Sequence, residues 1–190
     1  PSAALELTID LPAGVKPPPT LLQKTFLLKK IKLEGVTAYR EGGLVHLYRD
    51  LLGKTITFGQ FYAIAEVIQA RYNLDGYFLS FAYVPPQAVR DGVFRIAVVE
   101  GFIEDIRVIG VDESLQRDIE NTLRPIIDER PLRLAPLERR LLLAGQIAGV
   151  TVTGVLQRSE KARGASELVV QAKHVALSGQ FGINNRGSEF

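Results

Sequence analysis

The stretch from Val89 to Gly110 (VRDGVFRIAVVEGFIEDIRVIG) constrains the fold most, because it contains two β-strand patterns with almost no linker between them. Within Val93–Val99 every second residue is a large apolar one, which is the period-two pattern of a half-buried strand. Ile103–Ile109 shows a similar alternation. Only Glu100-Gly101-Phe102 separates the two segments. The sequence therefore predicts two small folding units that are coupled almost rigidly.

Composition narrows the functional classes. A chain of 190 residues with 46% apolar residues is long enough for two packed cores. Its 23 basic and 21 acidic residues leave a net charge of +2, which gives no strong field for nucleic acid. The chain has no cysteine, so a disulfide framework, a thiolate nucleophile and a cysteine metal site are excluded. No apolar run approaches the roughly 18 residues of a membrane-spanning helix.

The first unit is predicted at residues 25–101, in the order strand, helix, helix, strand, strand. Thr57 followed by Gln60 is a capping-box pattern, which marks the start of the second helix. Asp91-Gly92 supplies a turn into the last strand. The predicted elements are a strand at Phe26–Val36, helices at Leu44–Leu52 and Thr57–Asn73, and strands at Phe78–Val84 and Val93–Val99.

The second unit, at residues 102–174, repeats this order with weaker signals. Asp112 or Ser114 can cap its first helix, and Pro136 is placed to open the second. The fold class is therefore α+β, with two tandem βααββ domains that each have a three-stranded sheet backed by two helices. Residues 1–24 contain Pro12 and three consecutive prolines, and they are predicted to be an extended, poorly packed lead-in.

Residues 175–190 carry a different pattern. From His174 to Ile183 polar or small residues alternate with mostly apolar ones, as in a strand with one face toward lipid. We expect the first strand of a transmembrane β-barrel to begin here. The alternative is an ordinary exposed terminal strand.

Catalytic chemistry is hard to assemble from this sequence. His46 and His174 stand apart from any pattern of metal ligands or acid–base partners, and no phosphate-binding loop or nucleophile elbow occurs. We expect no enzyme activity, no catalytic or metal-binding residue and no cofactor. A small hydrolase or transferase is the competing class, and it would require a deep pocket with perturbed titratable groups.

Several short motifs occur in a fixed order along the chain. They are Tyr72 with Asp75-Gly76-Tyr77, Val84-Pro85-x-Gln87-x-x-x-Asp91-Gly92, Val98-Val99-Glu100-Gly101, Leu137-Glu138-Arg139, the segment Gly164–Val170, and Asn185-Arg186-Gly187-Ser188. Together with the βααββ repeat, this order resembles the two POTRA domains (polypeptide-transport-associated modules) of two-partner secretion transporters of the haemolysin-secretion and activation type.

The resemblance implies a periplasmic docking arm of an outer-membrane protein in a Gram-negative bacterium. Its implied partners are an unfolded secreted exoprotein, recognised through its secretion domain, and the transporter's own C-terminal β-barrel; nucleic acid is not among them. The alternative is a POTRA-like module of an outer-membrane assembly insertase or of a division complex. More than two repeats or an N-terminal transmembrane helix would favour that alternative.

The candidate docking site is a sheet edge. Val93–Val99 can pair with both other strands of its unit, which leaves Phe78–Val84 at an edge without any charge. An extended client segment could add a strand there, helped by Lys30 and Lys32. The competing interpretation is that the aromatic residues pack inward and that Pro85-Pro86 or the second unit covers the edge. The candidate partner-binding residues are Phe78, Leu79, Ser80, Phe81, Ala82, Tyr83 and Val84, and the joint residues are Glu100 and Gly101.

Overall fold

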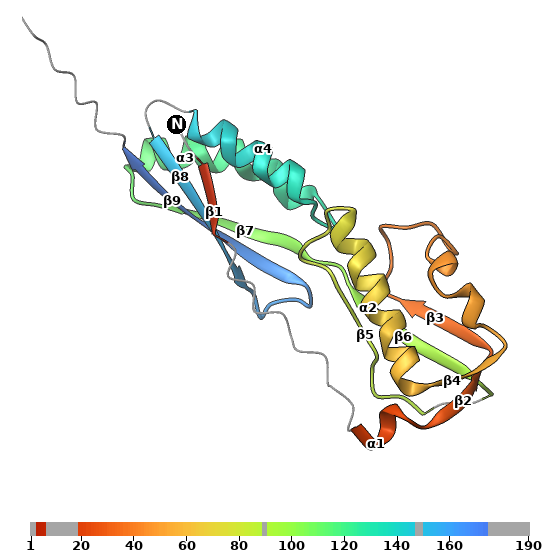
Figure 1. Cartoon of the computed structure of the whole chain (residues 1–190). Helices are drawn as coiled ribbons and strands as arrows, with labels where there is room; N and C mark the ends of the chain where they lie inside the picture. Colours follow the sequence, from red (N-terminus) through yellow and green to blue (C-terminus); the bar gives the residue numbers. More distant parts are fainter. Residues whose placement is uncertain (1–2, 7–18, 89–90, 147–149, 175–190) are drawn as a thin grey trace, which may run out of the picture.

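The computed structural model describes residues 3–6, 19–88, 91–146 and 150–174. These residues form two units of mixed strands and helices that lie end to end and meet near Gly101 (Figure 1). The α+β class predicted from the sequence is thereby confirmed. The predicted barrel strand at residues 175–190 lies outside the described residues.

The sheet of the first unit has three strands in the order β3-β6-β5. Strand β6 (Val93–Val99) is parallel to β3 (Lys30–Glu34) and antiparallel to β5 (Phe81–Tyr83), which confirms that Val93–Val99 is the central strand. Strands β2 and β4 form a separate antiparallel pair. The other elements of this unit are α1 (Pro19–Leu22), β2 (Thr25–Leu28), the 3₁₀ turns η1 (Val45–Leu47) and η2 (Arg49–Leu51), β4 (Lys54–Thr57) and α2 (Phe58–Leu74).

Helix α2 begins with the predicted capping box. The Thr57 hydroxyl accepts a hydrogen bond from the Gln60 N–H (3.1 Å), and the Gln60 amide oxygen accepts one from the Thr57 N–H (2.9 Å). One face of the helix then buries Phe61, Ile64 and Ile68 against the sheet. Each of these side chains stabilises the fold by about 1.5–3 kcal/mol through burial.

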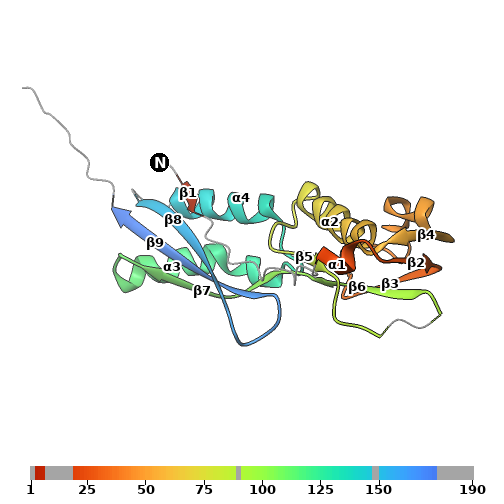
Figure 2. The ribbon, with the colours of Figure 1, turned by 60° about the horizontal axis from the view of Figure 1, so that its bottom comes forward.

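The second unit has a four-stranded sheet in the order β1-β8-β9-β7. Its central strand β9 is parallel to β7 and antiparallel to β8, and β1 pairs in parallel with the outer side of β8. Figure 2 shows α2 and α4 along one side of the molecule, with β3, β6 and β7 on the other. The elements are β1 (Ala3–Glu6), β7 (Phe102–Ile109), α3 (Glu113–Leu123), the 3₁₀ segment η3 (Arg124–Asp128), α4 (Leu134–Gly145), β8 (Val150–Arg158) and β9 (Ala165–His174).

Helix α3 is capped by Asp112, one of the two predicted caps. Its carboxylate accepts hydrogen bonds from the N–H groups of Leu115 (3.1 Å) and Ser114 (3.0 Å). These backbone donors lower the pKa of Asp112, because they stabilise its ionised form. The helix gives way to η3 at Arg124, where Pro125 removes a backbone donor.

Two predicted elements of the first unit are wrong in detail. The strand predicted at Phe26–Val36 is divided into β2 and β3, because the N–H groups of Lys29 and Lys30 both donate to the Gly92 carbonyl (2.9 and 3.3 Å). The helix predicted at Leu44–Leu52 is instead the pair of 3₁₀ turns η1 and η2. Its backbone N–H groups bond three residues back instead of four, as in Leu47 to Leu44 and Leu51 to Tyr48 (3.1 and 3.0 Å).

The lead-in also differs from the prediction of a poorly packed tether. Residues Ala3–Glu6 form β1 and extend the second sheet to four strands, whereas three were predicted. Residues Pro19–Leu22 form α1, which contacts α2. The periodicity of the sequence carried no signal for either contact, since both elements have only four residues.

Candidate functional site

The predicted edge strand is present but shorter than expected. Only Phe81–Tyr83 forms β5, and it pairs with Ala97–Val99 on one side. Phe78 and Leu79 lie in a turn in which the Ser80 N–H donates to the Tyr77 carbonyl (3.0 Å). Phe78–Ser80 therefore does not belong to the edge.

A side chain of α2 covers part of the outer side of β5. The Gln69 amide nitrogen donates to the Ser80 carbonyl (2.8 Å), and its amide oxygen accepts from the Ala82 N–H (2.7 Å). A side-chain amide has the same donor and acceptor groups as a peptide unit. Gln69 thus takes the hydrogen-bonding positions that a neighbouring strand would use.

A second glutamine replaces a strand further along the sheet. After Pro85-Pro86 the chain cannot donate normally to the ladder, as the sequence predicted. The Gln87 amide takes over, because its oxygen accepts from the Arg95 N–H (2.7 Å) and its nitrogen donates to the Arg95 carbonyl (2.9 Å). Sequence reasoning noted Gln87 only as part of a motif and missed this contact, as it missed that of Gln69.

The apolar side chains of the candidate segment do not form a free surface. Leu79 is only 6% exposed and belongs to the core of the second unit, against which Phe78 also packs. Ser80 is fully buried. Phe81 and Tyr83 are half-buried, with ring centroids 5.9 Å apart. Leu79 and Ser80 therefore face inward, and of the aromatic residues Phe78 packs against a core while Phe81 and Tyr83 stay partly exposed.

Lys30 and Lys32 are not close to this edge. Both are exposed and lie on β3, which β6 separates from β5. Lys32 forms an ion pair with Glu34 (3.4 Å) on its own strand. A client paired with β5 would therefore find these lysines on the opposite edge of the sheet.

Glu100 holds the end of β6 to the segment that follows β3. Its carboxylate accepts hydrogen bonds from the N–H groups of Thr37 (2.8 Å) and Ala38 (2.8 Å), from the Thr37 hydroxyl and from the Tyr72 hydroxyl (2.7 Å). Burial and the bond to Glu100 raise the pKa of Tyr72. Its phenol therefore stays protonated and remains a donor at neutral pH.

Gly101 packs tightly against the turn that contains Leu79, at the junction of the two units. A Cβ atom there would stand 2.4 Å from the Leu79 Cβ and 2.5 Å from the Leu79 carbonyl oxygen. The Gly101 N–H donates to the Ser80 hydroxyl (3.1 Å), and its carbonyl accepts from the Leu132 N–H (2.8 Å). Both units thus bond to the same residue, and glycine is required there by the close approach.

The loop between β8 and β9 contacts the joint as well. The Arg163 guanidinium donates to the Tyr83 hydroxyl and lies 5.1 Å from the centre of its ring. The Phe102 N–H donates to the Gly164 carbonyl (3.0 Å). The second unit therefore touches one end of β5 in addition to the Leu79 turn.

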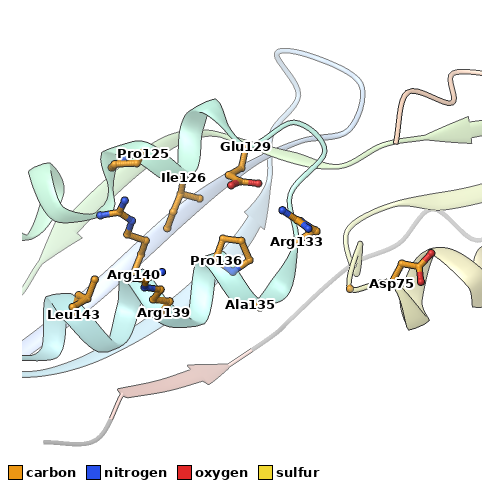
Figure 3. Close-up of a pocket in the computed structure, with 11 residues that line it drawn as sticks. Asp75, Pro125, Ile126, Glu129, Arg133, Ala135, Pro136, Arg139, Arg140 and Leu143 are labelled. Carbon is orange, nitrogen blue, oxygen red and sulfur yellow. The ribbon is translucent and has the colours of Figure 1, made fainter. Parts of the chain in front are cut away.

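An open cleft of about 610 Å³ lies where η3 and α4 approach the end of α2 (Figure 3). Arg133, Arg139 and Arg140 line it, together with the carboxylates of Asp75 and Glu129. Asp75 is already paired with Arg71 (2.8 Å). Within the part of the chain that the structure describes, the three lining arginines form no ion pair. The charged side chains that line the cleft therefore carry a net positive charge.

The described residues hold neither a cluster of metal ligands nor a helix suited to span a membrane. Over the described ranges, no three His, Cys, Asp or Glu side chains come together as a metal site would require. None of the helices built from these residues has the length and apolar character needed to cross a bilayer.

The sequence of the first unit matches a known family. Residues 26–101 fit the family model described as POTRA domain, ShlB-type. The first unit is a POTRA domain of the ShlB type. This confirms the resemblance to the POTRA domains of two-partner secretion transporters that the ordered motifs indicated.

A curated relative extends the likeness beyond the POTRA domain. The heme/hemopexin transporter protein HuxB of Haemophilus influenzae is 22% identical over 184 residues, which is 96% of this chain and 31% of HuxB. The chain therefore spans about a third of the length of that relative.

Solved structures share the fold of both units. CdiB from Escherichia coli matches 86% of this chain and 29% of its own, with a TM-score of 0.68 and 20% identity. The N-terminal domain of Omp85 from Thermosynechococcus elongatus matches 78% of this chain and 66% of its own, with a TM-score of 0.58 and 20% identity. At these identities the likeness establishes the fold.

Proposed function

We propose that this segment is the periplasmic docking arm of an outer-membrane two-partner secretion transporter. In this proposal it binds the unfolded secreted exoprotein, here called the client, and passes it to a β-barrel pore that forms the rest of the protein. The ShlB-type POTRA domain, the relative named as a transporter and the share of that relative's length that the chain covers all favour this role.

The docking site is proposed because the Gln69 amide hydrogen-bonds along the outer side of β5. Its two hydrogen bonds, to Ser80 and Ala82, have the donor and acceptor pattern of a strand. A client segment that displaces Gln69 would exchange these bonds one for one with main-chain bonds and then continue along the edge. Main-chain pairing gives affinity without demanding a particular client sequence, which suits capture of an unfolded chain.

The second candidate is a module of an outer-membrane assembly insertase. The fold likeness to the N-terminal domain of Omp85 favours it. The ShlB-type match favours secretion instead. Client capture would distinguish the two, because an insertase binds unfolded barrel proteins rather than one exoprotein.

Substitutions at Gln69 and Ala82 test the docking site. Gln69→Ala frees the outer groups of β5, so we expect it to strengthen client binding roughly three- to tenfold, the equivalent of one ordinary hydrogen bond. Ala82→Pro removes the donor and should weaken binding about tenfold. The measurement is fluorescence anisotropy of the labelled client secretion domain, diluted from urea.

The matched control is Glu66→Ala, which alters an exposed residue one turn earlier on α2. It should leave the affinity unchanged. Circular dichroism would confirm that α2 is intact in each variant. Equal affinity for the wild type and for both edge variants would rule out β5 as the docking edge.

A further inference from the structure

The outer edge of β8 is occupied by the chain's own N-terminal segment. Strand β1 pairs in parallel with β8 from Ala3 opposite Val152 to Glu6 opposite Val155. It also contacts α4. Among the described residues, the pairing with β1 covers four of the nine residues of β8.

Without β1, this edge would be unprotected. The strand has the sequence VTVTGVLQR, which contains no proline and carries a charge only at its last residue, Arg158. Sheets usually protect an outer strand with charged residues, proline or a bulge. Here the described residues use the pairing with β1 instead, so β8 can accept an extended strand and already holds a short one.

The resident strand is poorly suited to hold its place. It has four residues, and parallel pairing is slightly less stable per residue than antiparallel pairing. A longer extended segment could pair along most of β8 and would gain more hydrogen bonds than β1 makes.

We propose that the β8 edge is a second strand-accepting site for the client, and that Ala3–Glu6 is its resident occupant, which the client displaces. This inference rests on the proposed docking function. It adds a binding site in the second unit, at which the client competes with Ala3–Glu6 for the edge of β8. Client binding is then weaker than the open edge would allow, because β1 must first leave.

A disulfide that locks β1 in place tests this competition. The chain has no cysteine, so Ala4→Cys with Thr153→Cys introduces one defined pair at positions that lie opposite each other in the ladder. The pair is placed in an Ala82→Pro background, which blocks the first edge. The probe is the unfolded secretion domain of the client, measured by anisotropy.

We expect the oxidised form to bind the client at least fivefold more weakly than the same protein after reduction. A chain without residues 1–6 should bind it several-fold more tightly than the intact chain. Each single-cysteine variant, under oxidising conditions, should bind as the reduced pair does.

Equal binding by the oxidised and reduced forms would overturn this inference, and the effects of Gln69→Ala and Ala82→Pro would still support the docking function. If no form binds the client, the proposed function fails with it. As a test of the edge alone, a labelled peptide of residues 1–10 should bind the shortened chain and not the oxidised pair; binding to neither would show that β8 accepts no strand.

Discussion

Gly101→Val is expected to change the angle between the two units and to lower the stability of the chain by about 3 kcal/mol, the upper range for overpacking a tight contact. A side chain at this position would overlap the Cβ and carbonyl of Leu79, whose backbone is held by neighbouring turns. The backbones must therefore separate. Small-angle scattering would report the change of shape, and thermal unfolding the loss of stability.

Gly145→Ala is the matched control, because a Cβ atom added at this α4 residue would meet nothing within 4 Å. It should leave the shape unchanged and the stability nearly so. The account of Gly101 would be contradicted if Gly101→Val kept the wild-type scattering profile and weakened both cores equally.

Leu79→Ala should destabilise the second unit by about 2–5 kcal/mol, although Leu79 lies within the first POTRA domain of the sequence. The substitution leaves a cavity in the core formed by α3, α4 and β7–β9. Hydrogen exchange followed by mass spectrometry would resolve the two units. Relative to the wild type, we expect the exchange rate to rise more in β9 than in β6.

Leu74→Ala is the chemically matched control, since Leu74 is 82% exposed at the end of α2. It should change stability by less than about 0.5 kcal/mol. Faster exchange in β6 alone after Leu79→Ala would show that Leu79 supports the first core instead.

These contacts fix the joint between the two units. Gly101 and Leu79 connect the units through backbone hydrogen bonds, close backbone contact and core packing, while Glu100 holds the adjoining end of β6 within the first unit. Arg163 reaches back from the second unit to Tyr83 at the end of β5. A client segment that binds both β5 and β8 would therefore meet two edges at a set spacing.

The position of the joint could be predicted from the sequence, because two period-two patterns flank Glu100-Gly101 with no room for a linker. The start of α2 could also be predicted from the sequence, since Thr57 and Gln60 bond to each other within one turn. Local patterns of this kind depend on neighbouring residues alone.

The contacts that shape the candidate site could not be predicted in this way. Glu100 bonds to Thr37, which is 63 residues away, and Gln69 bonds to a strand that follows its helix. The sequence pattern placed Leu79 in an apolar strand. Nothing in the local sequence distinguishes a residue at a sheet edge from one that enters the core of the neighbouring unit. Such roles depend on how the units are placed in space.

Hydrogen exchange by NMR on the complex of the wild-type chain with its unfolded client tests the central claim most directly. If the arm captures the client by strand addition, the outward-facing amide of Ala82 gains protection, while the amides of the exposed residues Glu66 and Val67 of α2 do not change. A client that binds and perturbs only the outer face of α2 or the arginine-lined cleft, with the sheet edges unchanged, would contradict the account.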